Sequence, residues 1–254
     1  MIRVEGVSKS FGERHVLRHC SLQVDRGETL VVIGASGTGK STLLRIVIGL
    51  VAPDAGRVLV DGQDVHALPP RELRRIRARM GYLFQSGALV NWLTVGENIA
   101  LPLVEVLRWP KPRADAKIEE VLALVGLSGT RDLYPSQVSG GMRKRAALAR
   151  SLATNPEILL YDEPTTGLDP VTAHIIDQVI NDLRGKLGVT SIVVSHDMAG
   201  TFRVADRIAM LYDGRIIAQG GPDEFRDSAD PLVRQFVTGA LEGPMSDARK
   251  EGTT

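Results

Sequence analysis

A glycine-rich turn between an apolar run and a helical pattern constrains this 254-residue chain more than any other feature. The turn spans residues 34–42 and reads GASGTGKST, the apolar run is 29–33, and the helical pattern is 43–47. A strand, a loop with the spacing G-x-x-x-x-G-K-S and a helix, in that order, make a P-loop. Glycines let backbone N–H groups approach phosphate oxygens, and the N-terminus of the helix favours negative charge. We therefore predict that this turn binds the phosphates of a nucleoside triphosphate.

Individual residues of the turn have distinct expected roles. Lys40 is expected to reach the β- and γ-phosphates, and the Ser41 hydroxyl is expected to ligate Mg²⁺. The other residues expected to line the phosphates are Gly34, Ser36, Gly37, Gly39 and Thr42. The alternative is an ordinary glycine-containing turn, and the match at eight positions in this context argues against it. By itself the turn indicates only that a nucleoside triphosphate binds.

Length and composition limit the class of protein. The length allows one large α/β domain or two joined subdomains. A net charge of +1 lacks the basic footprint of a nucleic-acid-binding protein, and one cysteine excludes an internal disulfide framework. Cys20 is expected in the core. No apolar run is long enough to cross a bilayer and the first residues lack a signal-peptide pattern, so we expect a soluble, cytoplasmic chain that meets a membrane only through a partner.

Strands and helices alternate along most of the chain. The expected strands are 2–8, 15–24, 29–33, 57–60, 80–84, 158–161 and 189–194. The expected helices after the P-loop begin near Arg71, Gly141 and Val171, and the helix at Arg71 has an arginine-rich face expected to lie in solvent. This alternation predicts a mainly parallel sheet with helices on both faces. Residues 85–136 have a helical pattern and are expected to form an insertion into the sheet domain.

Two carboxylates end the apolar strand at 158–161. Continuous apolarity is typical of a strand buried on both faces of a parallel sheet. Asp162, at the tip, is placed to hold Mg²⁺, and Glu163 is placed to polarise an attacking water molecule. A surface acidic pair at a strand end is the structural alternative. Together with the P-loop, the pattern predicts a Walker B strand.

A second turn of small residues, Ser139, Gly140 and Gly141, opens a helix and could form another anion site. The P-loop already surrounds most of a bound triphosphate, so a second phosphate-binding turn needs an explanation. At this point the sequence resembles the ATP-binding-cassette family, in which this turn is the signature motif. Cassettes of that family pair head to tail, and each ATP lies between the P-loop of one subunit and the signature turn of the other.

Four further residues match the family's motifs in order. Phe11 matches the aromatic residue that stacks on adenine, Gln85 the Q-loop residue that senses Mg²⁺ and water, Asp169 the D-loop, and His196 the switch histidine near the γ-phosphate. The structural alternatives are a surface aromatic, a strand-end cap, a helix N-cap and a satisfied loop histidine. The resemblance implies an α/β fold: a P-loop NTPase (RecA-like) core with an N-terminal antiparallel β subdomain and an inserted α-helical subdomain.

The resemblance also implies domain boundaries. Residues 1–240 are expected to form a single nucleotide-binding domain, with 1–84 and 137–240 as the α/β core and its β subdomain and 85–136 as the helical subdomain. Residues 241–254 are expected to be a polar tail, preceded by a short amphipathic helix at 231–237.

The outer signature residues, Val138 and Met142, differ from the common Leu and Gln of the family. The string SGGMRKRAALAR that starts at Ser139 is similar to the MlaF/Mkl branch, which powers phospholipid transport by Mce-type systems in bacterial envelopes. This implies ATP and Mg²⁺ as cofactors, a homodimer, and a place on the cytoplasmic face of the inner membrane. The implied partners are an integral-membrane permease, a small regulatory subunit and an Mce-domain protein, with no nucleic acid.

The alternatives are an ATPase for import of polar solutes such as amino acids, a cassette of DNA repair, and a non-hydrolysing regulatory cassette. The short span from the P-loop to Walker B leaves no room for the coiled coils of DNA-repair cassettes, and Lys40, Glu163 and His196 argue against the regulatory cassette.

Asn91 and Trp92 are candidate contacts to the permease, although a core position for Trp92 is equally compatible with the sequence.

Overall fold

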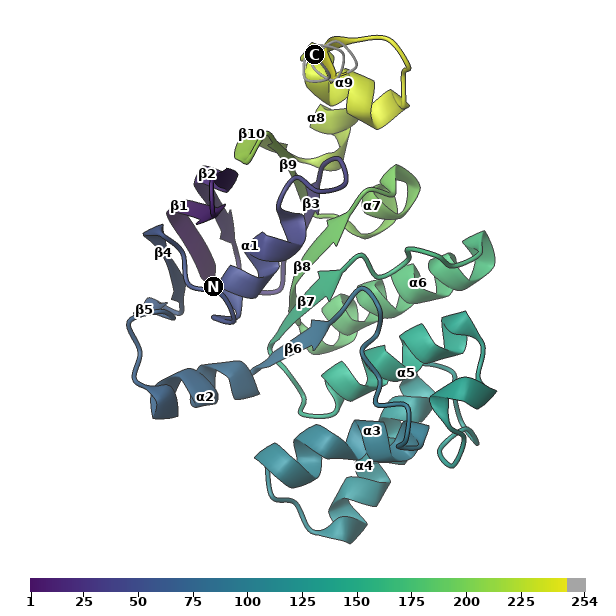
Figure 1. Cartoon of the computed structure of the whole chain (residues 1–254). Helices are drawn as coiled ribbons and strands as arrows, with labels where there is room; N and C mark the ends of the chain where they lie inside the picture. Colours follow the sequence, from purple (N-terminus) through teal and green to yellow (C-terminus); the bar gives the residue numbers. More distant parts are fainter. Residues whose placement is uncertain (246–254) are drawn as a thin grey trace.

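Two sheets organise the described part of the chain, residues 1–245, in this computed structural model (Figure 1). The four-stranded sheet is antiparallel and has the order β2 (Arg14–Val24), β1 (Ile2–Phe11), β4 (Ala55–Val60), β5 (Gln63–Asp64). The six-stranded sheet has the order β10 (Arg215–Gly220), β9 (Arg207–Tyr212), β3 (Thr29–Ile33), β8 (Thr190–Ser195), β7 (Ile158–Asp162), β6 (Met80–Leu83). Its strands are parallel except for β10, which forms a hairpin with β9. The α/β fold class and the mainly parallel sheet are confirmed.

The three central strands β3, β8 and β7 are buried at every residue. Such strands need apolar residues on both faces, as their sequences provide. Ile33 pairs with Ser195, and Asp162 pairs with Val194, so the three strands end at one edge of the sheet. The loops that follow them must therefore lie together.

The two faces of the large sheet belong to different hydrophobic clusters. Leu30 and Val32 of β3 pack with helix α1 (Lys40–Val47) and the antiparallel sheet, whereas Val31 and Ile33 pack against the helices of the opposite face. This alternation follows from the two-residue period of a strand. Figure 1 shows α1 and the antiparallel sheet on one side, with α5 (Gly140–Leu152) and α6 (Pro170–Leu187) on the other. The predicted helices on both faces are confirmed.

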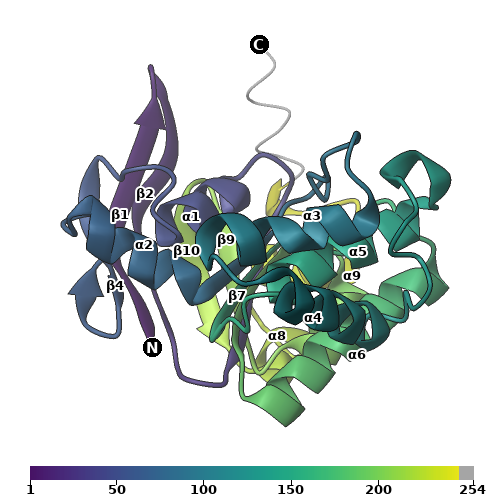
Figure 2. The ribbon, with the colours of Figure 1, turned by 90° about the horizontal axis from the view of Figure 1, so that it is seen from below.

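The insertion between β6 and α5 is helical in part. It contains α3 (Val95–Leu101), the π-helix η1 (Pro102–Val106), α4 (Lys111–Leu124) and the 3₁₀ turn η2 (Pro135–Gln137), and Figure 2 shows α3 and α4 beside α5. Residues 85–94 are not helical, contrary to the predicted pattern. The buried Asn98 amide explains this, because it accepts from Val90 N at 2.7 Å and donates to Val90 O at 3.0 Å, which fixes the loop.

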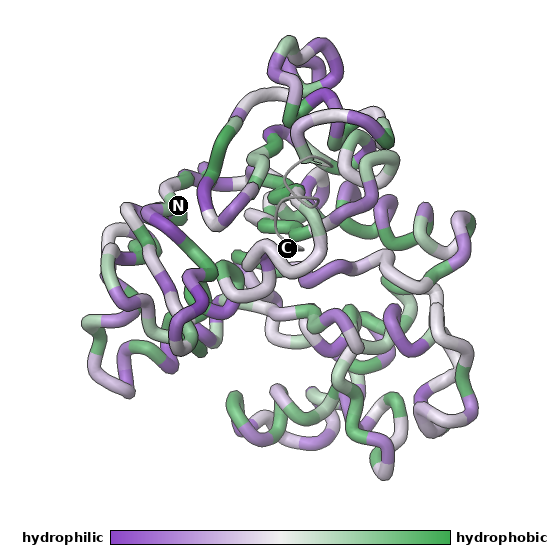
Figure 3. The backbone as a smooth tube through the Cα atoms, turned by 45° about the horizontal axis from the view of Figure 1, so that its top comes forward, coloured by the Kyte–Doolittle hydropathy of each residue, from purple (hydrophilic) through white to green (hydrophobic). Residues whose placement is uncertain are grey.

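The remaining helices surround this core. They are α2 (Pro70–Ala78), α7 (Met198–Val204), α8 (Pro222–Arg226) and α9 (Pro231–Thr238). Figure 3 shows hydrophobic and hydrophilic residues alternating along the helices, as expected for helices that cover a sheet with one face. None of the helices within residues 1–245 has the length and hydropathy needed to cross a membrane.

Several local predictions can be compared with the structure. Cys20 is buried, as expected, and the amphipathic helix at 231–237 is α9. Strand β1 is longer than predicted, because it extends to Phe11, which pairs with Arg14 across the turn. Trp92 is 80% exposed, so the core alternative for this side chain is wrong. The predicted polar tail lies largely outside the described residues, since 246–254 are not among them.

Gly81 lets β6 approach α5 closely. A Cβ atom there would lie 2.4 Å from the Ser151 carbonyl oxygen and 2.5 Å from Leu159 Cδ2. We expect Gly81→Ala to lower the free energy of unfolding by about 1–3 kcal/mol, because packed backbone must move. Gly185→Ala, in α6, is the matched control, because a Cβ atom there would lie in open space. This substitution should raise the free energy of unfolding by about 0.5–1 kcal/mol, since alanine favours a helix more than glycine does. Urea denaturation measures both, and equal effects would contradict the close approach.

Candidate functional site

A cavity of about 370 Å³ lies at the edge where the central strands end. The P-loop follows β3, Asp162 ends β7 with Glu163 next, and His196 follows β8. The predicted site residues that line the cavity are Phe11, Ser36, Gly37, Gly39, Lys40, Ser41, Thr42, Gln85 and Glu163. The structure thus brings residues from four distant segments to this cavity, and His196 reaches it through its contact with Glu163. Phe11 is 53% exposed at the rim, which leaves its ring open to a stacking partner.

The P-loop needs its glycines for conformation and for space. Gly34 and Gly39 have φ angles of 155° and 105°. A Cβ on Gly34 would lie 2.3 Å from the Leu211 carbonyl oxygen, and one on Gly39 would lie 2.8 Å from the Val16 carbonyl oxygen. The loop leads directly into α1, whose first backbone N–H groups have no partner within the helix. This arrangement is suited to an anion.

Lys40 is a buried cation at the centre of the loop, with 4% of the residue exposed. Its Nζ donates to the carbonyl oxygens of Gly34 at 2.8 Å and Ala35 at 3.0 Å, and it lies 3.6 Å from Glu163 Oε1. Burial lowers the pKa of this ammonium group, and the charges of Glu163 and Asp162 oppose that shift. The nearby carboxylates therefore favour the charged form that phosphate binding requires.

Asp162 and Ser41 are in direct contact, since Ser41 Oγ donates to Asp162 Oδ1 at 2.6 Å. The Tyr82 hydroxyl donates to the other carboxylate oxygen at 3.1 Å. Burial, together with the negative charge of Asp162, raises the pKa of Tyr82, so the hydroxyl remains a donor at neutral pH. A hydroxyl and a carboxylate beside a phosphate site are oxygen ligands of the kind that Mg²⁺ takes, so the residues present fit this ion.

Glu163 has the most constrained geometry of the site. Its φ is 52°, in the left-handed region, and the residue is 8% exposed. Its Oε2 accepts from Thr166 Oγ1 at 2.6 Å and lies 2.6 Å from His196 Nδ1. Its backbone oxygen accepts from Lys144 Nζ at 2.8 Å. A histidine and a lysine thus converge on the residue whose carboxylate lines the cavity.

Sequence reasoning missed three of these residues: Tyr82, Lys144 and Thr166. Tyr82 could be placed only after β6 was known to pair with β7. Thr166 lies three residues after Glu163, which is a local signal for a side-chain contact in a turn. Lys144 belongs to a basic run on α5, and nothing in the sequence distinguishes its buried ammonium from the exposed neighbour Arg143.

The signature turn lies apart from this cavity, because Ser139, Gly140 and Gly141 are not among the residues that line it. Ser139 caps α5 by accepting from Met142 N at 3.2 Å. The structure instead places the turn against the start of α6, where a Cβ on Gly141 would lie 2.6 Å from Thr172 Cγ2.

Asp169 caps α6 by accepting from the N–H groups of Val171 and Thr172, both at 3.0 Å. The Thr172 hydroxyl also donates to it at 2.6 Å, and this bond holds the pKa of Asp169 below its usual value. The helix-cap alternative for Asp169 is therefore confirmed, and its role across a dimer stays a prediction.

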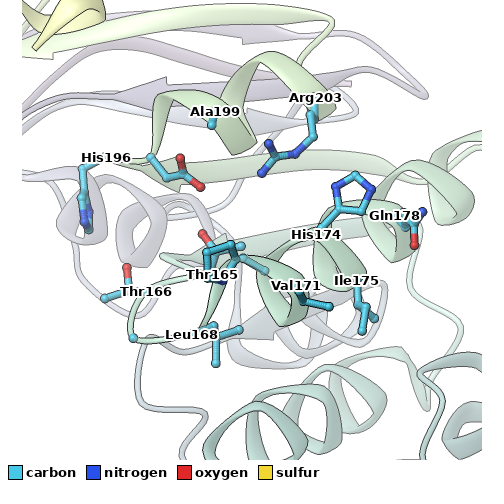
Figure 4. Close-up of a pocket in the computed structure, with 14 residues that line it drawn as sticks. Thr165, Thr166, Leu168, Val171, His174, Ile175, Gln178, His196, Ala199 and Arg203 are labelled. Atoms are coloured by element: carbon cyan, nitrogen blue, oxygen red, sulfur yellow. The ribbon is translucent and has the colours of Figure 1, made fainter.

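A second cavity, of about 880 Å³, lies between α6 and α7 (Figure 4). His196 and Thr166 form one end, and His174 and Arg203 lie along its length. Val171 at the start of α6 lines it and is 72% exposed. His196 therefore contacts Glu163 on one side and lines the cavity beside α6, the helix that Asp169 caps, on the other.

Comparisons with known proteins agree with this geometry. The family model described as "ABC transporter" matches residues 17–166. The chain is 41% identical to the intermembrane phospholipid transport system ATP-binding protein MlaF of Escherichia coli, over 96% of this chain and 91% of that protein. It is 39% identical to the probable ribonucleotide transport ATP-binding protein mkl of Mycobacterium tuberculosis, over 99% of this chain and 71% of that protein. A solved ATP-binding cassette, a dimer in a post-hydrolysis state bound to ADP and Pi, superposes with a TM-score of 0.81 at 34% identity and covers 87% of this chain and 99% of its own.

The contact between Gly141 and Thr172 gives a test of how the signature turn is seated. Gly141→Ala should lower the free energy of unfolding by about 1–3 kcal/mol, because the hydrogen bond to Asp169 holds the Thr172 methyl group in its way. Thr172→Ser removes that methyl group and keeps the hydroxyl. In a urea double-mutant cycle, we expect the serine to recover most of the loss. Additive effects of the two substitutions would show that the turn packs elsewhere.

Proposed function

Because the chain belongs to the ABC transporter family, whose members are ATPases, we propose that it is the ATP-hydrolysing subunit of a bacterial transporter that moves phospholipid between the membranes of the envelope. The ATPase proposal rests on Lys40 and Glu163, which line the P-loop cavity 3.6 Å apart, and on His196, whose Nδ1 lies 2.6 Å from the Glu163 carboxylate. The cargo is supported by the 41% identity to MlaF over nearly the full length of both chains. The alternative cargo is a polar solute, because the relative mkl is named for ribonucleotide transport.

The proposed mechanism assigns each site residue a step. Lys40 and the backbone N–H groups of the P-loop bind the β- and γ-phosphates, and Phe11 stacks on the adenine. Glu163 accepts a proton from the attacking water at its carboxylate, and His196 holds that carboxylate and braces the γ-phosphate side.

When bound, Mg²⁺ would neutralise charge on the phosphate oxygens, and Ser41, Asp162 and Gln85 would hold it. The contact between Ser41 and Asp162 supports this assignment, since it places two oxygen ligands side by side. Tyr82 would orient the Asp162 carboxylate through its hydrogen bond.

The site needs a second copy of the chain. Ser139, Gly140 and Gly141 form an anion-binding helix N-terminus that lies outside the P-loop cavity. In the proposed head-to-tail dimer, this turn contacts the γ-phosphate held by the other subunit, and Asp169 lies at the interface. The dimeric cassette that this chain resembles supports the arrangement. Closure would then exclude water and complete both sites.

A separate permease would convert closure into transport. This places the chain on the cytoplasmic face of the inner membrane, with an integral-membrane permease, a small regulatory subunit and an Mce-domain protein as proposed partners. The loop at 85–94 is the proposed docking segment for the permease, because Asn91 is exposed and the large Trp92 side chain is 80% exposed.

Glu163→Gln tests the catalytic assignment. It removes the base and keeps the shape, so we expect the turnover rate to fall about 10²- to 10⁴-fold while ATP still binds and traps a closed dimer. Phosphate release and size-exclusion chromatography with ATP measure the two effects. Glu119→Gln, on the exposed face of α4, is the matched control and should hydrolyse ATP normally. An undiminished ATPase rate in Glu163→Gln would contradict the assignment of Glu163 as the base.

Trp92→Ala and Asn91→Ala test the permease contact. Tryptophan is enriched among the interface residues whose truncation costs about 2 kcal/mol or more, so most of the permease should be lost on co-purification with Trp92→Ala. Leu187→Ala removes another exposed apolar side chain, at the end of α6, and should retain the permease. If both loop variants retained the permease fully, the proposal that residues 85–94 dock it would be wrong.

A further inference from the structure

Lys144 is a buried cation that the proposed mechanism does not use. It lies in the second turn of α5 and only 7% of it is exposed. Its Nζ donates to the backbone oxygens of Glu163 at 2.8 Å and Thr166 at 3.2 Å. Burial lowers the pKa of this ammonium group, and the charges of Glu163 and Asp162 oppose the shift. A lysine is rarely buried without a partner, and here the partners are two backbone oxygens of the turn that carries Glu163.

The carbonyl that Lys144 holds belongs to a strained residue. Glu163 has a φ of 52°, which costs a residue with a Cβ free energy unless its surroundings hold it there. On one side, its backbone N–H donates to the Val194 oxygen at 3.0 Å, at the end of β8. On the other side, its oxygen accepts from Lys144. The peptide groups on both sides of the Glu163 Cα are therefore fixed, and with them the direction of the side chain.

Lys144 also holds the turn that orients the carboxylate. Thr166 donates from its hydroxyl to Glu163 Oε2 at 2.6 Å, while its own backbone oxygen accepts from Lys144. One ammonium group thus ties together the backbone of the carboxylate and the backbone of the residue that hydrogen-bonds it. Removal of that ammonium group would take the side-chain donor away from both backbone oxygens, at Glu163 and Thr166, while the Glu163 N–H would stay bonded to Val194.

We propose that Lys144 is a positioning residue for Glu163, which aims the carboxylate at the P-loop cavity and links it to α5, the helix that carries the signature turn. The proposal rests on the proposed function, in that Glu163 is taken as the base. Lys144 is five residues after Ser139, a distance of about 7.5 Å along a helix. A shift of α5 when the other subunit's nucleotide contacts Ser139 would therefore move the Glu163 backbone in the same subunit. Lys144 gives the two sites of the dimer a direct physical connection.

The experiment compares Lys144→Met and Lys144→Gln in the full chain assembled with its permease. Lys144→Met keeps the length and loses the donor, so kcat should fall about tenfold or more while KM and ATP affinity change less than about twofold. Lys144→Gln retains an N–H donor and should recover part of kcat, which also covers the case in which Lys144→Met does not fold. Lys117→Met is the matched control, since this lysine is also 7% exposed but pairs with Glu120 and Asn155 in contacts separate from the P-loop cavity.

The same substitutions in a Glu163→Gln background separate this proposal from the proposed function. If Lys144 acts through Glu163, adding Lys144→Met should change the residual single-turnover rate by less than about twofold. Normal turnover in Glu163→Gln alone would overturn the base assignment, and the positioning role would fall with it. With Glu163→Gln inactive, the positioning role is overturned by a normal kcat in Lys144→Met, by an equal loss in Lys117→Met, or by a parallel loss of ATP affinity.

Discussion

The register of the three central strands is the constraint on which the rest of the structure depends. Ile33 of β3 pairs with Ser195 of β8, and Asp162 of β7 pairs with Val194, so the chain leaves all three strands at one edge. The P-loop, Glu163 and His196 are the first residues after those strands. A slip of one residue would turn each apolar side chain to the opposite face and separate the loops. Because the interior is close-packed on both faces of these strands, such a slip would force side chains into spaces of the wrong shape, and the core therefore fixes the geometry of the site.

Charge burial is the second feature that the site imposes on the fold. Lys40, Lys144, Asp162 and Glu163 are each less than 9% exposed, although buried charges are costly unless they are paired. Here both cations donate to backbone oxygens, Lys40 also lies 3.6 Å from the Glu163 carboxylate, and Asp162 accepts from Ser41, so each charge of the group has a partner. Lys40 is shared between Glu163 and the P-loop carbonyls, and a bound phosphate would compete for the same ammonium. The same contacts keep Glu163 in its strained backbone conformation, because strain at a functional site persists only where neighbouring groups hold it.

Most of the fold and much of the site could be predicted from the sequence. The P-loop, the buried strand with two carboxylates and the alternation of strands and helices depend on local patterns, and all of them lie where expected. The residues missed act through tertiary contacts: Tyr82 reaches Asp162 across neighbouring strands, and Lys144 reaches Glu163 from another element. The loop at 85–94 was wrongly expected to be helical because its conformation depends on the buried amide of Asn98, which periodicity does not reveal. Asp169 shows the opposite case, in which a local signal, a helix cap before Pro170, was sufficient to place the residue.

The central claim is that the P-loop cavity is half of a site and that the signature turn of a second copy completes it. Mixing two inactive variants tests it most directly, because Lys40→Ala destroys one half and Ser139→Ala the other. In a mixed head-to-tail dimer one site combines both defects, and the other site joins an intact P-loop to an intact signature turn. The account predicts that the mixture, with its permease, hydrolyses ATP although neither variant does so alone. A mixture as inactive as its two components, with mixed dimers shown to form, would contradict it.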